Sequence, residues 1–113
     1  MSIRLRLDKP WQPLTAEAAR RLPGQLGVYQ VADAGGTVLY IGQAGARSPF
    51  GLRSELQREF AERGAGCQFR VEVNQQYRSR WFELLMVHQA DHGGLPTDNA
   101  KNPPPNLGRL SPS

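Results

Sequence analysis

The chain has 113 residues, which is close to the commonest size of a single domain and enough for one modest hydrophobic core. Its net charge of +4 and its isoelectric point of about 9.8 favour polyanionic partners such as nucleic acid over acidic or neutral ones. No stretch approaches the apolar length of a membrane-spanning helix, and one cysteine excludes an intramolecular disulfide and a cysteine-based zinc site. We therefore expect a cytoplasmic protein with one domain, residues 1–113, and no separate specificity domain.

The cationic residues are unevenly divided, with twelve arginines against two lysines. The planar guanidinium of arginine can grip a phosphate through two hydrogen bonds, which suits contact with nucleic acid. A GC-rich genome would produce the same excess through its codons. The composition therefore leaves both explanations open.

The segment before residue 27 predicts two short elements. Apolar and cationic residues alternate over residues 3–7, which predicts a short strand, and Pro10 and Pro13 then break the chain. Thr15 can cap a short helix over residues 16–22, which a Pro-Gly pair ends. Both elements lead into the most informative part of the sequence.

Residues 27–42 predict a β-hairpin. Two runs rich in β-branched and aromatic residues flank residues 33–36, Asp-Ala-Gly-Gly, which supply the positive φ angles of a tight turn. Each run carries one tyrosine, Tyr29 in the first and Tyr40 in the second, and each run is bracketed by glycine. Two phenols should therefore emerge at defined positions on neighbouring strands.

Three elements are expected after the hairpin. Leu52, Leu56 and Phe60 recur at four-residue intervals and predict the buried stripe of a helix. Residues 68–73 alternate polar and apolar side chains, as a third strand would. Residues 78–92 predict a second long helix, with so many apolar residues that it should be buried on most sides.

Glu83 lies among the apolar residues of this second helix. A carboxylate there is costly unless it is paired, hydrogen-bonded or bound to a cation. Helical spacing offers Arg80 as a structural partner. His88 and His92 lie one turn apart, but a zinc pair would need further ligands, of which the sequence offers no obvious one.

The two halves of the hairpin, Gly27-Val28-Tyr29 and Tyr40-Ile41-Gly42, resemble the paired tripeptides of the GIY-YIG nuclease superfamily, with valine in place of one isoleucine. Each tripeptide alone suits many strand ends. The two together, about ten residues apart across a glycine turn and followed by a helix, are far more specific. The resemblance covers residues 23–99 as the core, followed by an irregular Pro-rich tail, residues 100–113.

This resemblance implies a fold and an activity. The fold would be α/β (α+β), with a small three-stranded antiparallel or mixed sheet flanked by helices. The activity would be that of a metal-dependent endonuclease that hydrolyses phosphodiester bonds in DNA. A homodimer or a partner protein would then supply specificity. The alternative is a catalytically weak or inactive nucleic-acid-binding module that keeps the fold, and a third interpretation is a protein-interaction domain.

The resemblance also implies the residues of the site. Tyr29 would act as the base and Tyr40 as its partner, with the reverse assignment left open, and cationic neighbours would have to favour deprotonation of a phenol. Arg53 would neutralise charge on the scissile phosphate. Glu83 would hold Mg²⁺ or Mn²⁺, because such an ion needs few protein ligands beside water and phosphate. Asn99, in a Pro-x-x-Asn setting, would organise the site locally.

Some of these assignments have alternatives in the sequence. An alignment of the first long helix on Phe60 would move the arginine position of the family to Glu55 and the next functional position to Glu59, both of them acidic. Asn106 is the alternative to the asparagine at position 99.

The residue after the second tripeptide departs from the family. Many members carry a lysine there, whereas this chain has Gln43, and Arg47 is the nearest cation that could replace it. The loss of that charge supports the alternative of a weak or inactive module.

Overall fold

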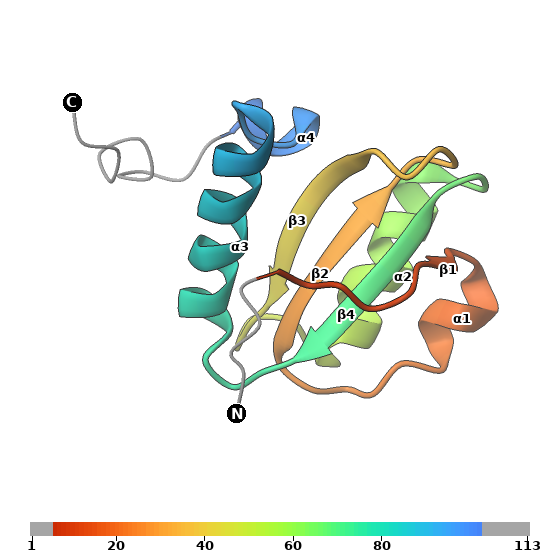
Figure 1. The fold of residues 1–113 in the computed structure, drawn as a ribbon. Helices are drawn as coiled ribbons and strands as arrows, with labels where there is room; N and C mark the ends of the chain where they lie inside the picture. The colour runs from red at the N-terminus through yellow and green to blue at the C-terminus, as the bar shows by residue number, and fades with distance from the viewer. Residues whose placement is uncertain (1–5, 103–113) are drawn as a thin grey trace.

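Residues 6–102 are the part of the chain that the computed structural model describes. They form four strands and four helices, which are in chain order β1 (Gln12–Pro13), α1 (Ala16–Arg20), β2 (Gly27–Ala32), β3 (Val38–Ala44), α2 (Gly51–Arg63), β4 (Gln68–Val73), α3 (Tyr77–His92) and α4 (Thr97–Ala100). The strands make one antiparallel sheet in the order β1-β4-β2-β3 (Figure 1). The domain is thus α+β, with β3 at one edge of the sheet.

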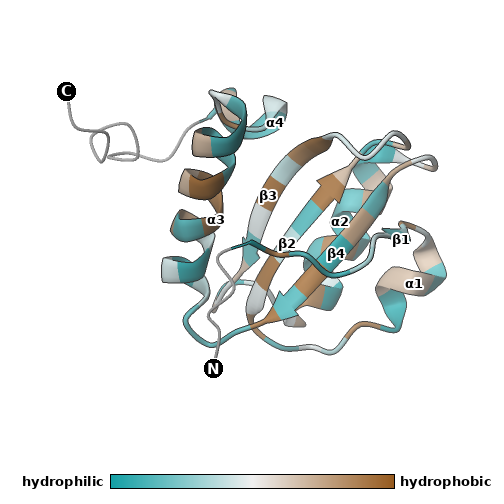
Figure 2. Ribbon diagram, viewed as in Figure 1, coloured by the Kyte–Doolittle hydropathy of each residue, from teal (hydrophilic) through white to brown (hydrophobic). Residues whose placement is uncertain are grey.

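Two hydrophobic clusters lie on opposite faces of this sheet, because successive strand residues point to opposite sides. On one face Tyr29 packs with Leu52 and Leu56 of α2. On the other face Val28 packs with Leu84 of α3. Figure 2 shows the same alternation of apolar and polar residues along β4. The sheet therefore lies between α1 and α2 on one side and α3 on the other.

The predicted hairpin is present, and its turn is stabilised as its sequence suggests. The Asp33 carboxylate accepts hydrogen bonds from the backbone N–H groups of Gly35 and Thr37, each 2.9 Å long. Gly36 has a φ of +92°, which glycine adopts at little cost. These contacts fix the register of β2 against β3.

The two halves of the hairpin motif pack directly against each other. Tyr29 lies opposite Gly42 in the register of β2 and β3. A Cβ atom at position 42 would lie 2.3 Å from Cζ of the Tyr29 ring, so the ring needs a glycine there. The second tripeptide thus makes room for the tyrosine of the first.

Most elements were predicted at the right place. Thr15 caps α1 through a 3.0 Å hydrogen bond from the N–H of Ala18, and Gly64 ends α2 with a φ of +74°. The predicted third strand, residues 68–73, is β4. None of the helices within residues 6–102 is long and apolar enough to cross a membrane.

Three features differ from the predictions. A fourth strand, β1, pairs with β4 where the prolines predicted only a break, and Pro13 is tolerated because β1 is an edge strand. The short helix α4 occupies part of the segment expected to be irregular. The prediction that α3 is buried on most sides was wrong. Its outer side faces solvent, with Met86 39% exposed, because α3 forms a single layer on the sheet.

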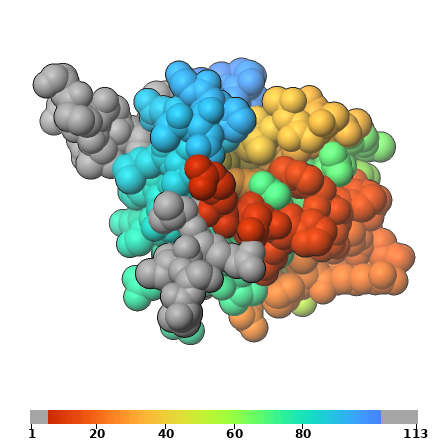
Figure 3. All heavy atoms as spheres, in the orientation of Figure 1, coloured from red at the N-terminus to blue at the C-terminus, as the bar shows by residue number. Residues whose placement is uncertain are grey.

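The segment from residue 6 to β1 crosses the sheet (Figure 1), and its atoms lie against those of α3 (Figure 3). Leu7 is buried against the α3 side of the core, and Arg6 forms a 2.7 Å ion pair with Asp91. The packed unit therefore takes in residues before position 23. The expected strand over residues 3–7 lies mostly outside the described residues, as do residues 103–113 of the expected tail.

Candidate functional site

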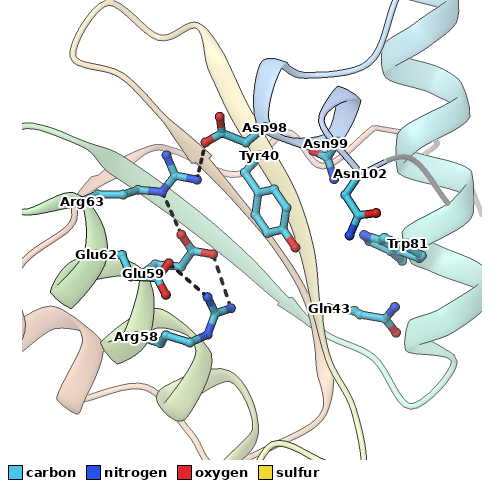
Figure 4. Close-up of a pocket in the computed structure, with 10 residues that line it drawn as sticks. All are labelled: Tyr40, Gln43, Arg58, Glu59, Glu62, Arg63, Trp81, Asp98, Asn99 and Asn102. Carbon is cyan, nitrogen blue, oxygen red and sulfur yellow. Dashed lines mark hydrogen bonds and ion pairs between the residues drawn. The ribbon is translucent and has the colours of Figure 1, made fainter.

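A pocket of about 500 Å³ opens beside β3, where α2, α3 and α4 approach the edge of the sheet (Figure 4). Tyr40 of the hairpin lies in its centre, half-buried. The residues that line it are Tyr40, Gln43, Arg58, Glu59, Glu62, Arg63, Trp81, Asp98, Asn99 and Asn102.

A chain of polar contacts ties the wall of this pocket together. Tyr29 is fully buried, and its hydroxyl donates a 2.8 Å hydrogen bond to Oε2 of Glu59, which is 2% exposed. Nε of Arg63 donates to Oε1 of the same glutamate at 2.7 Å, and Nη2 of Arg63 lies 2.7 Å from Oδ2 of Asp98. Strand β2, helix α2 and helix α4 are therefore joined through the buried Glu59 carboxylate and the Arg63 guanidinium.

Arg58 extends this network toward solvent. Its Nη2 donates to Oε1 of Glu55 at 2.6 Å and to the Tyr29 hydroxyl at 3.4 Å, and its Nη1 lies 3.3 Å from Oε1 of Glu62. The side chain of Arg58 is 46% exposed. Both arginines of the pocket are thus already paired with carboxylates.

The pocket brings together the two tyrosines that the sequence singled out. The ring centroids of Tyr29 and Tyr40 lie 6.0 Å apart, with the ring planes inclined by 52°. Burial raises the pKa of the Tyr29 phenol well above its ordinary value, and the Glu59 carboxylate raises it further. Burial also raises the pKa of Tyr40, and the opposing effect of Arg58 is too small to reverse this. Both phenols therefore stay protonated at neutral pH.

Asn99 lines the pocket and covers the outer edge of β3. Its Oδ1 accepts a 2.7 Å hydrogen bond from the N–H of Ile41, and its Nδ2 donates to the carbonyl of the same residue at 2.9 Å. Nε1 of Trp81 also donates to that carbonyl at 2.9 Å. The buried amide thus pairs with an edge strand as a neighbouring strand would. The alternative, Asn106, lies outside the described residues.

Arg53 and Glu83 do not line this pocket. Nε of Arg53 donates a 2.9 Å hydrogen bond to the carbonyl of Leu22, which ties α2 to the segment just after α1. The two positions from the alternative alignment, Glu55 and Glu59, are the ones on the tyrosine side of α2. Glu59, an acidic residue, therefore lies next to Tyr29.

Glu83 has the structural partner that helical spacing predicted. It forms an ion pair with Arg80, which also makes a two-pronged contact with Glu72 of β4, with bonds of 2.9 and 3.1 Å. Burial alone would raise the pKa of Glu72, but the hydrogen bonds from Arg80 and Asn74 outweigh it and lower the pKa. This cluster joins α3 to the sheet.

A metal ion at Glu83 would compete with the guanidinium of Arg80, which already contacts one oxygen of this carboxylate. Residues 6–102 contain no group of three or more His, Cys, Asp and Glu side chains that could hold a metal ion. His88 and His92 stack with ring centroids 4.3 Å apart, and Asp91 beside them is paired with Arg6.

The residues of the pocket that the sequence did not assign to the site are Arg58, Glu62, Arg63, Trp81, Asp98 and Asn102. The i,i+4 spacing of Glu59 and Arg63 indicates a helical ion pair, which is a common surface feature and carries little information about a site. The contacts of Glu59 and Arg63 with the tyrosines of the hairpin depend on how α2 lies across the sheet.

Together, the fold and the pocket define a small α+β domain with an antiparallel sheet and a charged pocket at the edge strand of a hairpin. A family model described as a domain of unknown function (DUF7508) matches residues 5–91. The chain belongs to this family. No curated protein and no solved structure matches the chain.

Proposed function

We propose that the protein binds nucleic acid, preferentially DNA, and that the pocket beside β3 receives the base and sugar of one nucleotide. The observation that carries this proposal is the composition of the pocket wall. The rings of Tyr40 and Trp81 and the amides of Gln43 and Asn102 line it, whereas its arginines are paired with carboxylates. Aromatic faces stack on bases and amides hydrogen-bond their edges, so such a wall suits the neutral part of a nucleotide.

Fluorescence anisotropy with labelled single-stranded, duplex and branched DNA tests this proposal. Tyr40→Leu should weaken binding by about tenfold, because stacking contributes about 1–3 kcal/mol per base. Phe50→Leu is the matched control, since Phe50 is an exposed aromatic residue outside the pocket. Equal affinity of the wild type and Tyr40→Leu, with both proteins folded by circular dichroism, would rule out the pocket as the binding site.

Metal-dependent cleavage of DNA is the second candidate function. The observations in its favour are the 6.0 Å separation of the two tyrosine rings and the position of Arg58, 3.4 Å from the Tyr29 hydroxyl. In this proposal Tyr29 and Tyr40 manage the attacking water. Arg53 would neutralise the phosphate, Asn99 would organise the site, and Glu83 would hold Mg²⁺ or Mn²⁺.

Binding without cleavage is the better supported candidate for two reasons. A tyrosine that acts as a base needs a lowered pKa, whereas burial raises the pKa of both tyrosines. The carboxylate of Glu83 is paired with Arg80 outside the pocket, and we therefore derive no step through a metal ion.

Cleavage assays on the same DNAs, with Mg²⁺ or Mn²⁺, separate the two candidates. Cutting that needs the metal, and that Glu83→Ala abolishes while Glu17→Ala on α1 does not, would establish the nuclease. Glu83→Ala should fold, because Arg80 keeps its contact with Glu72. Retained binding with no cutting by the wild type would support the binding module.

Target choice, partners and location belong to the same proposal. The shape of the DNA, a second copy of the chain or a partner protein would select the target. A cytoplasmic location is supported by the single cysteine, Cys67, which is a free thiol.

A further inference from the structure

A second hollow, of about 490 Å³, adjoins the Tyr40 pocket along the same edge of the sheet. Gln43 lines both of them. The walls of the hollow come from the loop after β3, from α2 and from the start of α3. The residues that line it are Gln43, Gly45, Ala46, Arg47, Ser48, Glu55, Tyr77 and Arg78.

Two arginines enter this hollow from different elements, Arg47 from the loop and Arg78 from α3. Both are exposed, and neither side chain has a hydrogen bond or ion pair with another residue of the described part of the chain. The acidic residue of the hollow, Glu55, is already engaged by Arg58 at 2.6 Å and by the Ser48 hydroxyl at 2.7 Å. The hollow therefore carries a net positive charge that the protein itself does not neutralise.

The loop that carries Arg47 is held on both sides. The N–H of Ser48 donates a 3.0 Å hydrogen bond to the carbonyl of Gly45, which closes a turn, and the Ser48 hydroxyl ties that turn to α2. Gly45 packs on Tyr77 so closely that a Cβ atom would lie 2.8 Å from the ring. The backbone at Arg47 is thus positioned before any ligand arrives, which reduces the entropic cost of binding.

We infer that this hollow binds a phosphate group, held between the guanidinium groups of Arg47 and Arg78. Arginine is suited to this ligand, because its planar fork donates two parallel hydrogen bonds to phosphate oxygens. The neutral side chain of Gln43 separates the hollow from the Tyr40 pocket, so a backbone phosphate in the hollow adjoins a base in the pocket. The inference that the hollow binds phosphate depends only on the residues of the hollow. The inference that this phosphate belongs to a nucleic acid rests on the proposed function.

The test compares Arg47→Ala and Arg78→Ala with Arg20→Ala, which removes an equal charge from an exposed site on α1. We expect each hollow variant to weaken binding of a labelled single-stranded DNA about tenfold, because charge-assisted hydrogen bonds contribute about 1.5–3 kcal/mol. The slope of log K against log salt should fall by about 0.7 for each lost phosphate contact. Arg20→Ala should change affinity less than twofold.

NMR titration with inorganic phosphate and with a nucleoside monophosphate tests the hollow independently of nucleic acid. Both ligands should shift the backbone amide signals of Arg47, Ser48 and Arg78. Tighter binding of the monophosphate than of inorganic phosphate would show that the neighbouring pocket also contributes to binding. Unshifted amides, together with wild-type DNA affinity of both arginine variants, would overturn the inference.

The two proposals can fail separately. Loss of DNA affinity in Arg47→Ala but not in Tyr40→Leu would retain the phosphate site and reject the base pocket. The opposite pattern would retain the proposed function and reject nucleic acid as the source of the phosphate, and unshifted amides in the NMR titration would then reject the phosphate site itself.

Discussion

The Tyr40 pocket and the neighbouring hollow are similar in volume and share Gln43, yet they differ in whether their arginines are paired with carboxylates. In the pocket, Arg58 and Arg63 are paired with carboxylates. In the hollow, Arg47 and Arg78 have no partner among residues 6–102. Burying a charge without a partner is costly, so the paired groups belong to the architecture of the fold. Exposed and unpaired arginines cost the fold little and remain open to a ligand.

This comparison separates residues that hold the domain together from residues that can recognise a partner. Substitutions in the paired network should lower stability. Substitutions in the hollow should lower binding and leave stability almost unchanged.

Glu59→Ala should have the largest effect on stability. The change leaves the Tyr29 hydroxyl and the Arg63 guanidinium without their shared acceptor in a buried site. Removing one partner of a buried ion pair costs about 3–5 kcal/mol, and urea unfolding would measure this loss. The matched control is Glu62→Ala on the same helix, whose side chain is 61% exposed and which should cost less than about 1 kcal/mol. Equal losses for the two variants would contradict the distinction between paired and open regions.

Asn99→Ala should have an intermediate effect. The N–H of Ile41 would lose its acceptor, whereas its carbonyl would keep the bond from Trp81. A buried donor without a partner costs about 1–3 kcal/mol. We also expect faster hydrogen exchange at Ile41, measured by NMR. Asn102→Ala, at an exposed position two residues after the end of α4, serves as the control and should leave that exchange rate unchanged. Unaltered exchange in Asn99→Ala would mean that the amide does not protect the edge strand.

Local patterns in the sequence were sufficient to predict most of the fold. The glycine turn, the spacing of Leu52 and Leu56 and the alternation over residues 68–73 each act within a few residues, and each produced the expected element. Strand β1 was missed because its two residues are stabilised by pairing with β4, far along the chain. Helix α4 is only one turn long, too short for a periodic pattern.

The candidate site was only partly predictable for the same reason. The tyrosines belong to one hairpin, and the pairing of Glu83 with Arg80 lies within one helical turn, so both could be inferred locally. The contact of Tyr29 with Glu59 joins residues 30 positions apart and depends on how α2 lies on the sheet. The bond from Ile41 to Asn99 spans 58 positions. Such contacts follow from tertiary packing, and no local spacing encodes them.

Asp98 should show the smallest effect, and that effect should depend on pH. Burial would raise the pKa of this carboxyl, but the hydrogen bonds from Arg63 and Lys101 outweigh it and lower the pKa below its ordinary value near 3.8. A carboxyl whose pKa is lowered by folding contributes stability that is fully present above the unfolded pKa and is lost as the pH falls through the folded pKa. Asp98→Asn should therefore be less stable than the wild type at pH 7, and the difference should shrink below about pH 4. Urea unfolding of both proteins between pH 3 and pH 7 measures this change. A difference that stays constant over that range would show that the contact with Arg63 contributes through packing and not through charge, and would place Asp98 outside the paired network.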